Sequence, residues 1–125
     1  MISGLIAVAV GAVLGAWARW GLAIWLNAST PSLPLGTLVS NLVGGYVIGV
    51  LVAFFSANTA IAPEWRLVSI TGFLGALTTF STFSAESVEL MLAGRFGAAA
   101  LHTAAHLFGS LALTAAGIAT YRALT

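Results

Sequence analysis

Residues 72–84 read G-F-L-G-A-L-T-T-F-S-T-F-S and lie inside a hydrophobic segment long enough to cross a bilayer. This stretch forms a helix poorly, because glycine loses backbone entropy there and β-branched residues such as threonine lose rotamer freedom. We therefore expect the helix to be interrupted. In hydrocarbon each unpaired backbone amide or carbonyl is costly, so unwound backbone persists only where it lines a cavity or binds something. We interpret the stretch as an ion site that the other segments enclose.

The composition of the chain is that of an integral membrane protein. It has 125 residues, of which 60% are hydrophobic and 6% are charged, whereas about a quarter of the residues are charged in an ordinary soluble domain. We expect residues 1–125 to form a single transmembrane domain. The absence of cysteine excludes disulfides, thiol catalysis and a thiolate metal site. The net charge of +1 is too small to indicate a nucleic-acid partner.

Hydrophobic runs separated by turn residues predict four spanning helices. They cover residues 2–26, 35–55, 65–92 and 96–121, and the third contains the predicted interruption. The connections are a turn-rich loop at 27–34, a segment at 56–64 that includes Pro63, and a tight turn at 93–95. Residues 1–4 contain no basic residue, so we expect the first hydrophobic run to be a membrane helix rather than a cleavable signal.

The few basic residues bear on orientation in the membrane. Arg66 and Arg122 belong to the side that holds both termini, whereas Arg19 and Arg95 lie nearest the opposite side. Because orientation follows the Lys/Arg imbalance of short loops, a balanced chain is expected to insert both ways round. Oppositely inserted copies can then pair about a two-fold axis in the membrane plane. The alternative is that other factors fix one orientation.

Small residues recur at four-residue spacing in the first two spans and predict close helix packing. These residues are Ala7, Gly11 and Gly15 in the first span and Gly45 and Gly49 in the second. Polar residues continue the same faces, with Arg19 in the first span and Thr37 and Asn41 in the second. Arg19 is either an interfacial anchor or part of an ion pathway. The amide of Asn41 either donates hydrogen bonds to an anion or bridges two helices.

A polar line runs along the fourth span. It consists of His102, His106, Ser110 and Thr114, each four residues from the next. Ser110 and Thr114 alone would be weak indicators, because hydroxyls can bond the carbonyl four residues earlier. Together with the histidines they predict one wall of a hydrated path, which Thr82 and Glu86 could continue. We expect no carboxylate cluster at ligand spacing from the histidines, and therefore no zinc or iron site.

These segments resemble one family over the whole chain. Residues 72–83, the N-L-V-G-G segment at 41–45 and the G-A-V-L-G-A-W-A-R segment at 11–19 are similar to the Fluc (CrcB) fluoride ion channels. The chain departs from the family pattern at Ala76, where many relatives have glycine, and at His106, where tyrosine is common. The resemblance implies an antiparallel, dual-topology homodimer in the bacterial inner membrane, with two fluoride pores along its interface. It also implies passive fluoride efflux, hence fluoride resistance, and no catalysis.

The resemblance also assigns roles to single residues. It implies that the backbone carbonyls of Gly75 and Thr78, from the two crossed interruptions, hold one structural sodium ion at the dimer interface. Asn41 matches the pore-lining asparagine, and Phe80 and Phe83 match the paired phenylalanines of the family. The predicted pore further contains Ser81, Thr82, Glu86, His106, Ser110 and Thr114, and Arg19 is assigned to the vestibule.

The aromatic residues admit two interpretations on physical grounds. The positive ring edges of Phe80 and Phe83 can attract a small anion without a fixed charge that would trap it. Alternatively, both rings are ordinary packing residues.

Two other functions must be weighed against a channel. A dual-topology multidrug exporter driven by protons needs a titrating carboxylate deep in the membrane. The first two spans contain no carboxylate, and both glutamates of the third lie off-centre. A non-conducting assembly subunit would need only glycine-rich packing faces, and the polar stripes on three spans argue against it.

Overall fold

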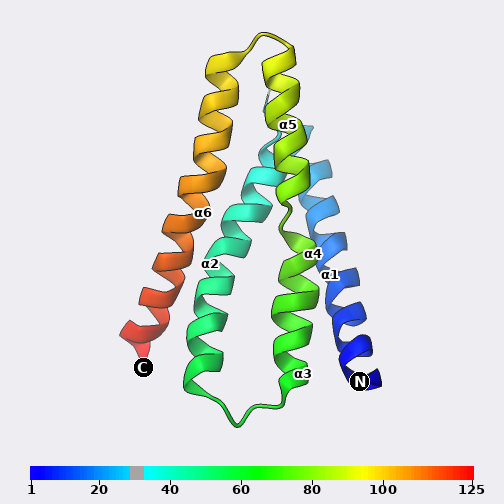
Figure 1. Ribbon diagram of the computed structural model, residues 1–125, viewed down its shortest axis with the longest axis vertical. Coiled ribbons are helices and arrows are strands. Elements are labelled where there is room, and N and C mark those ends of the chain that lie inside the picture. Colours follow the sequence, from blue (N-terminus) through cyan, green and yellow to red (C-terminus); the bar gives the residue numbers. More distant parts are fainter. Residues whose placement is uncertain (29–32) are drawn as a thin grey trace.

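The computed structural model describes residues 1–28 and 33–125 and consists of long helices joined by short connections (Figure 1). Three spans are the continuous helices α1 (Ile2–Asn27), α2 (Leu35–Ala57) and α6 (Phe96–Leu124). The third span is divided into α3 (Pro63–Arg66), η1 (Leu67–Leu74), α4 (Gly75–Leu77) and α5 (Phe80–Leu92). Within the described residues, four helical segments are long and apolar enough to cross a membrane. The predicted all-α fold with four spans is confirmed, and part of the predicted 27–34 loop lies outside the described residues.

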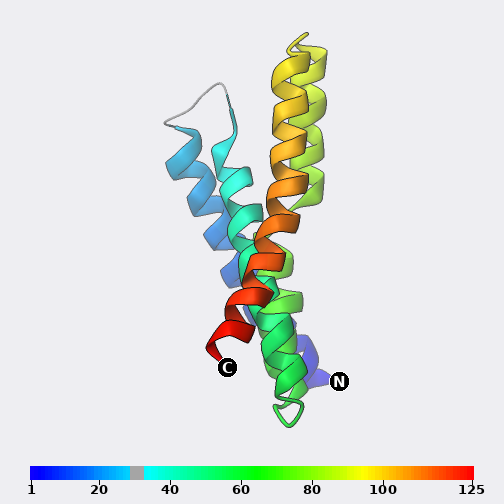
Figure 2. The ribbon, with the colours of Figure 1, turned by 90° about the vertical axis from the view of Figure 1, so that its left-hand side faces the viewer.

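Both ends of the chain lie at the same end of the bundle (Figure 1). The α5–α6 hairpin extends away from that end, and α1 and α2 lean away from the hairpin when the molecule is turned (Figure 2). The most extensive helix contacts are those of α2 with α6 and of α1 with η1. The third span therefore lies between α1 on one side and the α2–α6 pair on the other.

The third span loses its helical conformation at two threonines. Thr78 has φ −86° and ψ 152°, and Thr79 has φ −152° and ψ 117°, so both are extended before α5 begins at Phe80. β-branched residues favour this conformation. Gly72 and Gly75, which the sequence analysis also counted as weak points, remain helical. The helix therefore opens at the threonines and not at the glycines.

A π-helical segment, η1, precedes this interruption. The N–H of Gly75 bonds the carbonyl of Ile70, five residues earlier, as well as that of Gly72. Single turns of π-helix are rare and occur often at functional sites. The amino-acid pattern contains no signal for this segment, and the sequence analysis did not predict it.

Close contact between helices explains most of the glycines. A methyl group at Gly11 would overlap the Val68 carbonyl oxygen and would lie 2.7 Å from the Phe73 backbone nitrogen. Between α2 and α6, methyl groups at Gly49 and Gly117 would overlap backbone carbonyls of the facing helix. The packing role predicted for the small residues is therefore confirmed at these contacts. Such close approach stabilises helix pairs in lipid, where no hydrophobic drive brings helices together.

This packing predicts opposite effects for two glycine substitutions. Gly11→Ala forces α1 away from η1, and overpacking of this kind costs about 1–3 kcal/mol. Gly21→Ala is the matched control, because no atom of the described residues lies within 4 Å of a methyl group there and alanine favours helix over glycine by about 1 kcal/mol. We expect thermal denaturation in detergent to show a lower midpoint for Gly11→Ala only. Equal midpoints for the two variants would contradict the packing account.

Candidate functional site

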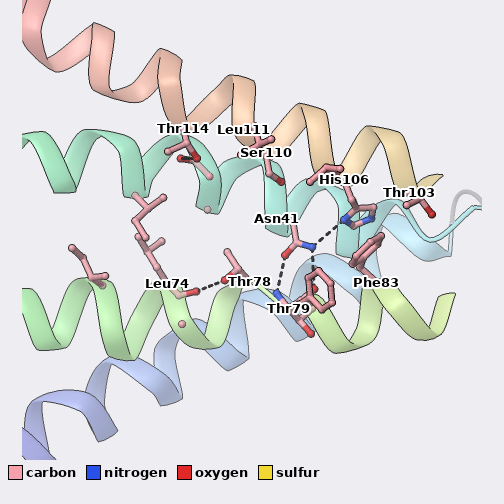
Figure 3. A pocket seen from close by; sticks show the side chains of 17 residues that line it. Asn41, Leu74, Thr78, Thr79, Phe83, Thr103, His106, Ser110, Leu111 and Thr114 are labelled. Atoms are coloured by element: carbon pink, nitrogen blue, oxygen red, sulfur yellow. Dashed lines mark hydrogen bonds between the residues drawn. The ribbon is translucent and has the colours of Figure 1, made fainter. Parts of the chain in front are cut away.

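A cavity of about 610 Å³ lies beside the interrupted span, between α2, η1, α5 and α6 (Figure 3). It brings together eight of the predicted site residues: Asn41, Gly75, Thr78, Phe80, Phe83, His106, Ser110 and Thr114. Among the described residues that line it, none is an aspartate, glutamate, lysine or arginine. The cavity therefore offers hydroxyl, amide, imidazole and aromatic groups without a permanent charge.

The other four predicted site residues lie outside the lining of this cavity. Ser81 and Thr82 surround the hydroxyl of Thr79. Glu86 lies against Thr37 and His102. On the opposite side of the span, Arg19 Nε donates to the Ala76 carbonyl oxygen at 2.9 Å. Arg19 thus bonds the backbone next to the interruption, a contact that neither interpretation of this residue had included.

The side chain of Asn41, on α2, bonds the backbone of the third span at its interruption. The N–H of Thr79 donates to Asn41 Oδ1 at 2.8 Å, and Asn41 Nδ2 donates to the Thr79 carbonyl at 3.1 Å (Figure 3). One side chain therefore satisfies both backbone groups of Thr79. This contact favours the helix-bridging interpretation of Asn41, since its amide oxygen and one amide hydrogen are directed at protein backbone.

The hydrogen bonds at the interruption leave two backbone carbonyl groups without their usual helical N–H partners. In a continuous helix the N–H of Thr79 would bond the Gly75 carbonyl, and the N–H of Thr82 would bond the Thr78 carbonyl. Here Thr79 N–H donates to Asn41 Oδ1, and Thr82 N–H donates to Thr79 Oγ1 at 3.1 Å. Carbonyl oxygens are ligands that hard cations prefer. The released carbonyls belong to Gly75 and Thr78, the pair for which the sequence analysis expects sodium, so the donor set fits such an ion.

Asn41 also determines where His106 carries its proton. Asn41 Nδ2 lies 3.0 Å from His106 Nδ1. Because Thr79 N–H must face an oxygen, the amide cannot be flipped, and the second Nδ2 hydrogen points at the imidazole. His106 Nδ1 is therefore the acceptor, and in the neutral ring the proton resides on Nε2. This Nε2 atom is buried and has no hydrogen-bond partner among the described residues.

Three aromatic rings are arranged along one side of the cavity. Phe83 stacks on the His106 imidazole, with ring centroids 4.7 Å apart and planes inclined by 27°. Phe80 meets Phe83 edge-on, at 5.2 Å and 76°. The Phe80 residue is 80% exposed in the single chain. One ring face of Phe83 is thus covered, whereas most of Phe80 remains available for contact outside the chain.

The hydroxyl groups of the site differ in whether their hydrogens are already donated to another group of the protein. Thr114 Oγ1 donates to the Gly45 carbonyl at 3.0 Å and so joins α6 to α2. Thr79 Oγ1 donates to Thr82 Oγ1 at 3.1 Å, so Ser81 must donate in its 3.3 Å contact with Thr79. This chain of bonds leaves the Thr82 hydroxyl hydrogen available to a ligand. Ser110 lines the cavity near Asn41 and His106 (Figure 3).

Glu86 lies next to both histidines. Its Oε1 accepts a hydrogen bond from Thr37 at 2.5 Å, and its Oε2 lies 3.3 Å from His102 Nε2. One potential ligand atom each from Glu86, His102 and His106 lies within 4.8 Å of the others. The sequence contains no His-x-x-Glu motif or carboxylate cluster at ligand spacing from the histidines, yet the fold brings Glu86 beside them. The contact joins α5 to α6, and spacing along one helix cannot reveal it.

Two positioning roles were not predicted from the sequence. Thr37 orients Glu86, and the hydroxyl of Thr79 accepts the N–H of Thr82 at the start of α5. The threonine before a new helix turn is a usual N-cap, and this signal could have identified Thr79. Four-residue spacing placed Thr37 on the same stripe as Asn41, but it could not identify Glu86 as the partner of Thr37, because Glu86 lies on another span.

The fold and the cavity define a multi-pass integral membrane protein with an uncharged, mainly apolar interhelical site, lined by a few polar groups and aromatic rings, at an interrupted helix. Residues 6–118 match the family described as CrcB-like protein, Camphor Resistance (CrcB), and the chain belongs to this family.

Relatives of high identity cover almost the whole chain. A protein of Cupriavidus necator is 58% identical over 97% of this chain and 96% of its own length, and one of Cupriavidus metallidurans is 59% identical over the same shares. A Ralstonia pickettii protein is 61% identical over 95% of this chain and 94% of its own length. Each of the three is named fluoride-specific ion channel FluC. The resemblance drawn from the sequence is therefore confirmed.

The Asn41 contact predicts a loss of stability that does not depend on transport. Asn41→Leu keeps the side-chain volume but leaves both backbone groups of Thr79 without their partner, which costs about 1–3 kcal/mol for each buried unpaired group. We expect a lower thermal unfolding midpoint in detergent. Ser69→Ala is the control, because Ser69 bonds only the Trp65 carbonyl of its own span. If Asn41→Leu unfolds at the midpoint of Ser69→Ala, Asn41 does not hold the interruption.

Proposed function

We propose that this chain is a fluoride-selective channel that lets fluoride leave the cell passively across the bacterial inner membrane. Family membership and the name that its relatives share support the proposal. The observation that carries it is a cavity with hydrogen-bond donors and aromatic edges but no permanent charge among its described lining residues. Conduction needs sites that bind an ion weakly enough to release it, and neutral donors meet this need better than a fixed cation.

The available donors suit a small anion that accepts strong hydrogen bonds. Among the described residues, the buried His106 Nε2–H has no hydrogen-bond partner, and the Thr82 hydroxyl hydrogen is not donated to another group. A hydrogen bond to a charged group is about twice as strong as one between neutral groups. Phe80 and Phe83 add ring edges, which carry partial positive charge. Asn41 contributes by orienting the His106 imidazole, while Ser110, Thr114, Ser81 and Glu86 complete the polar track and Arg19 the vestibule.

The channel is an antiparallel homodimer with two pores and one structural sodium ion. Two carbonyl groups of one chain are too few for a hard cation, which takes several oxygen ligands. A two-fold axis through the interruption would double the set to the Gly75 and Thr78 carbonyls of both copies. Gly75 is exposed in the single chain, and the nearest atom to a methyl group there is 3.7 Å away. When bound, sodium supplies a positive charge that joins the two copies.

The names of the relatives do not favour the proton-driven exporter. The structure adds a physical reason against it, since the one carboxylate near the cavity is bonded to Thr37 and lies close to His102. A transport carboxylate must exchange protons and substrate. A channel also requires no chemical step, so the proposal includes no enzyme activity.

The aromatic proposal predicts that Phe80→Ile and Phe83→Ile each abolish fluoride efflux, because isoleucine fills similar space without a positive ring edge. The measurement is fluoride release from reconstituted liposomes, followed with a fluoride electrode in the absence of a proton gradient. Phe108→Ile is the matched control, since Phe108 lies on α6, is 65% exposed and does not line the cavity. Size-exclusion chromatography checks that each variant keeps the oligomeric state of the original protein. Undiminished release by both pore variants would contradict the role of the rings.

A second prediction isolates the His106 donor. His106→Phe keeps a ring that can stack on Phe83 but removes the Nε2 hydrogen, whereas His106→Tyr restores a donor at the end of a ring. A hydrogen bond to a charged group contributes about 1.5–3 kcal/mol. We therefore expect fluoride efflux to fall about tenfold or more in His106→Phe and to be largely retained in His106→Tyr. Equal rates in these two variants would exclude hydrogen-bond donation by His106.

A further inference from the structure

The most unusual polar cluster of the molecule lies beside the proposed pore. Glu86 comes from α5, and His102 and His106 lie one turn apart on α6. His102 is 5% exposed and His106 is 3% exposed. Glu86 Oε2 and His102 Nε2 are buried and face each other at 3.3 Å, and His106 Nε2 is buried and has no hydrogen-bond partner among the described residues. Orphaned buried polar atoms are rare, and this one belongs to a cluster with a carboxylate and a second imidazole, which indicates a ligand that the three groups share.

We propose that Glu86, His102 and His106 bind a divalent transition-metal ion, with Zn²⁺ as the best fit, and that the bound metal blocks fluoride conduction. Two imidazole nitrogens and one carboxylate oxygen form a set that zinc takes in proteins, with a fourth position left open. Two histidines four residues apart on one helix present their rings to the same ion. Hard cations such as Mg²⁺ prefer oxygen ligands and do not suit this set.

The geometry requires only a small adjustment. Ligand atoms around tetrahedral zinc lie about 3.3 Å from one another, given Zn–N and Zn–O distances of about 2.0–2.2 Å. Glu86 Oε2 and His102 Nε2 are already 3.3 Å apart, and all three candidate ligand atoms lie within 4.8 Å. The His106 ligand atom must therefore come closer to the other two when a metal binds.

The surrounding contacts orient the ligands in the way that metal sites require. Thr37 donates to Glu86 Oε1, which leaves Oε2 directed at the histidines. The Thr103 hydroxyl donates to Ser87 Oγ at 3.0 Å. These residues follow His102 and Glu86 in the chain, so the bond joins α6 to α5 beside two of the ligands. Such outer contacts fix ligand orientation, and their loss typically weakens metal binding 10–100-fold.

Metal binding is incompatible with the hydrogen bonding of the proposed conducting state. A metal at His106 Nε2 takes the lone pair of that atom, so the ring must change tautomer: the Nε2 proton leaves to water, and Nδ1 takes up a proton from water to keep the ring neutral. Nδ1–H then faces the N–H of Asn41, which lies 3.0 Å away. Asn41 must turn aside and give up its bonds to Thr79. The metal thus removes the His106 donor and loosens the interruption. The block rests on the proposed function, whereas metal binding does not.

The sequence has two histidines, both in the cluster, and no cysteine, so the chain offers no other imidazole and no thiolate that could bind zinc elsewhere. The protein is purified without a polyhistidine tag, and Zn²⁺ and Mg²⁺ binding are measured by isothermal titration calorimetry in detergent. We expect one zinc ion per chain and no magnesium binding. Zinc K-edge absorption reports the ligands directly, and two imidazoles are expected.

Variants then locate the site. His102→Gln removes one ligand and is expected to weaken zinc binding at least tenfold. Glu89→Gln is the control, because Glu89 is an exposed glutamate on the same helix as Glu86, and we expect this variant to bind zinc as tightly as the unsubstituted protein. No zinc binding by the original protein, or equal binding by His102→Gln, would overturn the site. If His102→Gln does not fold, the absorption spectrum of the original protein decides, and a spectrum without imidazole ligands overturns the site.

The block is measured separately by fluoride release from liposomes with and without added Zn²⁺. For each protein, the rate of fluoride release with zinc is compared with its rate without zinc. We expect zinc to reduce release at least tenfold in the unsubstituted protein and in Glu89→Gln, but not in His102→Gln. Unchanged release at saturating zinc overturns the block while the metal site stands. No fluoride release in the absence of zinc would instead overturn the proposed function, and the calorimetric result would be unaffected.

Discussion

The structure depends on satisfying the backbone hydrogen bonds that a broken helix exposes in hydrocarbon. Each unpaired group there is costly, so a break persists only if other elements supply partners. At Thr78 and Thr79 these partners come from two other spans: Asn41 of α2 takes both backbone groups of Thr79, and Arg19 of α1 bonds the Ala76 carbonyl. The side chain of Thr79 accepts the N–H of Thr82 in the first turn of the next helix. The break is therefore a property of the bundle and not of one segment.

The glycines make these partners available. Arg19 and Asn41 reach the break because their helices approach the third span closely. Methyl groups at Gly15 of α1 and Gly44 of α2 would overlap the Phe73 carbonyl and the Thr78 side chain at these approaches. Small faces stabilise helix pairs in lipid through packing alone, and here the same faces set the depth at which each polar side chain meets its partner. Packing and site geometry thus have a common origin.

Local features of the sequence predicted the four spans and the approximate place of the break, because hydropathy and backbone propensity are properties of neighbouring residues. The partners could not be predicted in the same way. Four-residue spacing placed His102, His106 and Thr114 on one face of α6, yet they meet Glu86, Asn41 and the Gly45 carbonyl respectively. Which partner lies opposite depends on how far each helix is rotated and shifted. The π-helical turn of η1 likewise has no pattern of its own in the sequence.

Once all internal hydrogen bonds are counted, the uncommitted atoms define the chemistry of the site. The most telling is His106 Nε2, which is buried and unpaired. With its proton it is a donor and suits an anion; without it, the same atom is a ligand for a metal cation. The choice is made at Nδ1 by Asn41, whose amide is oriented by the N–H of Thr79. A backbone amide freed by the broken helix thus determines, through one asparagine, which sign of charge this imidazole favours. No charged side chain is needed for that preference, because the orientation of one amide is sufficient.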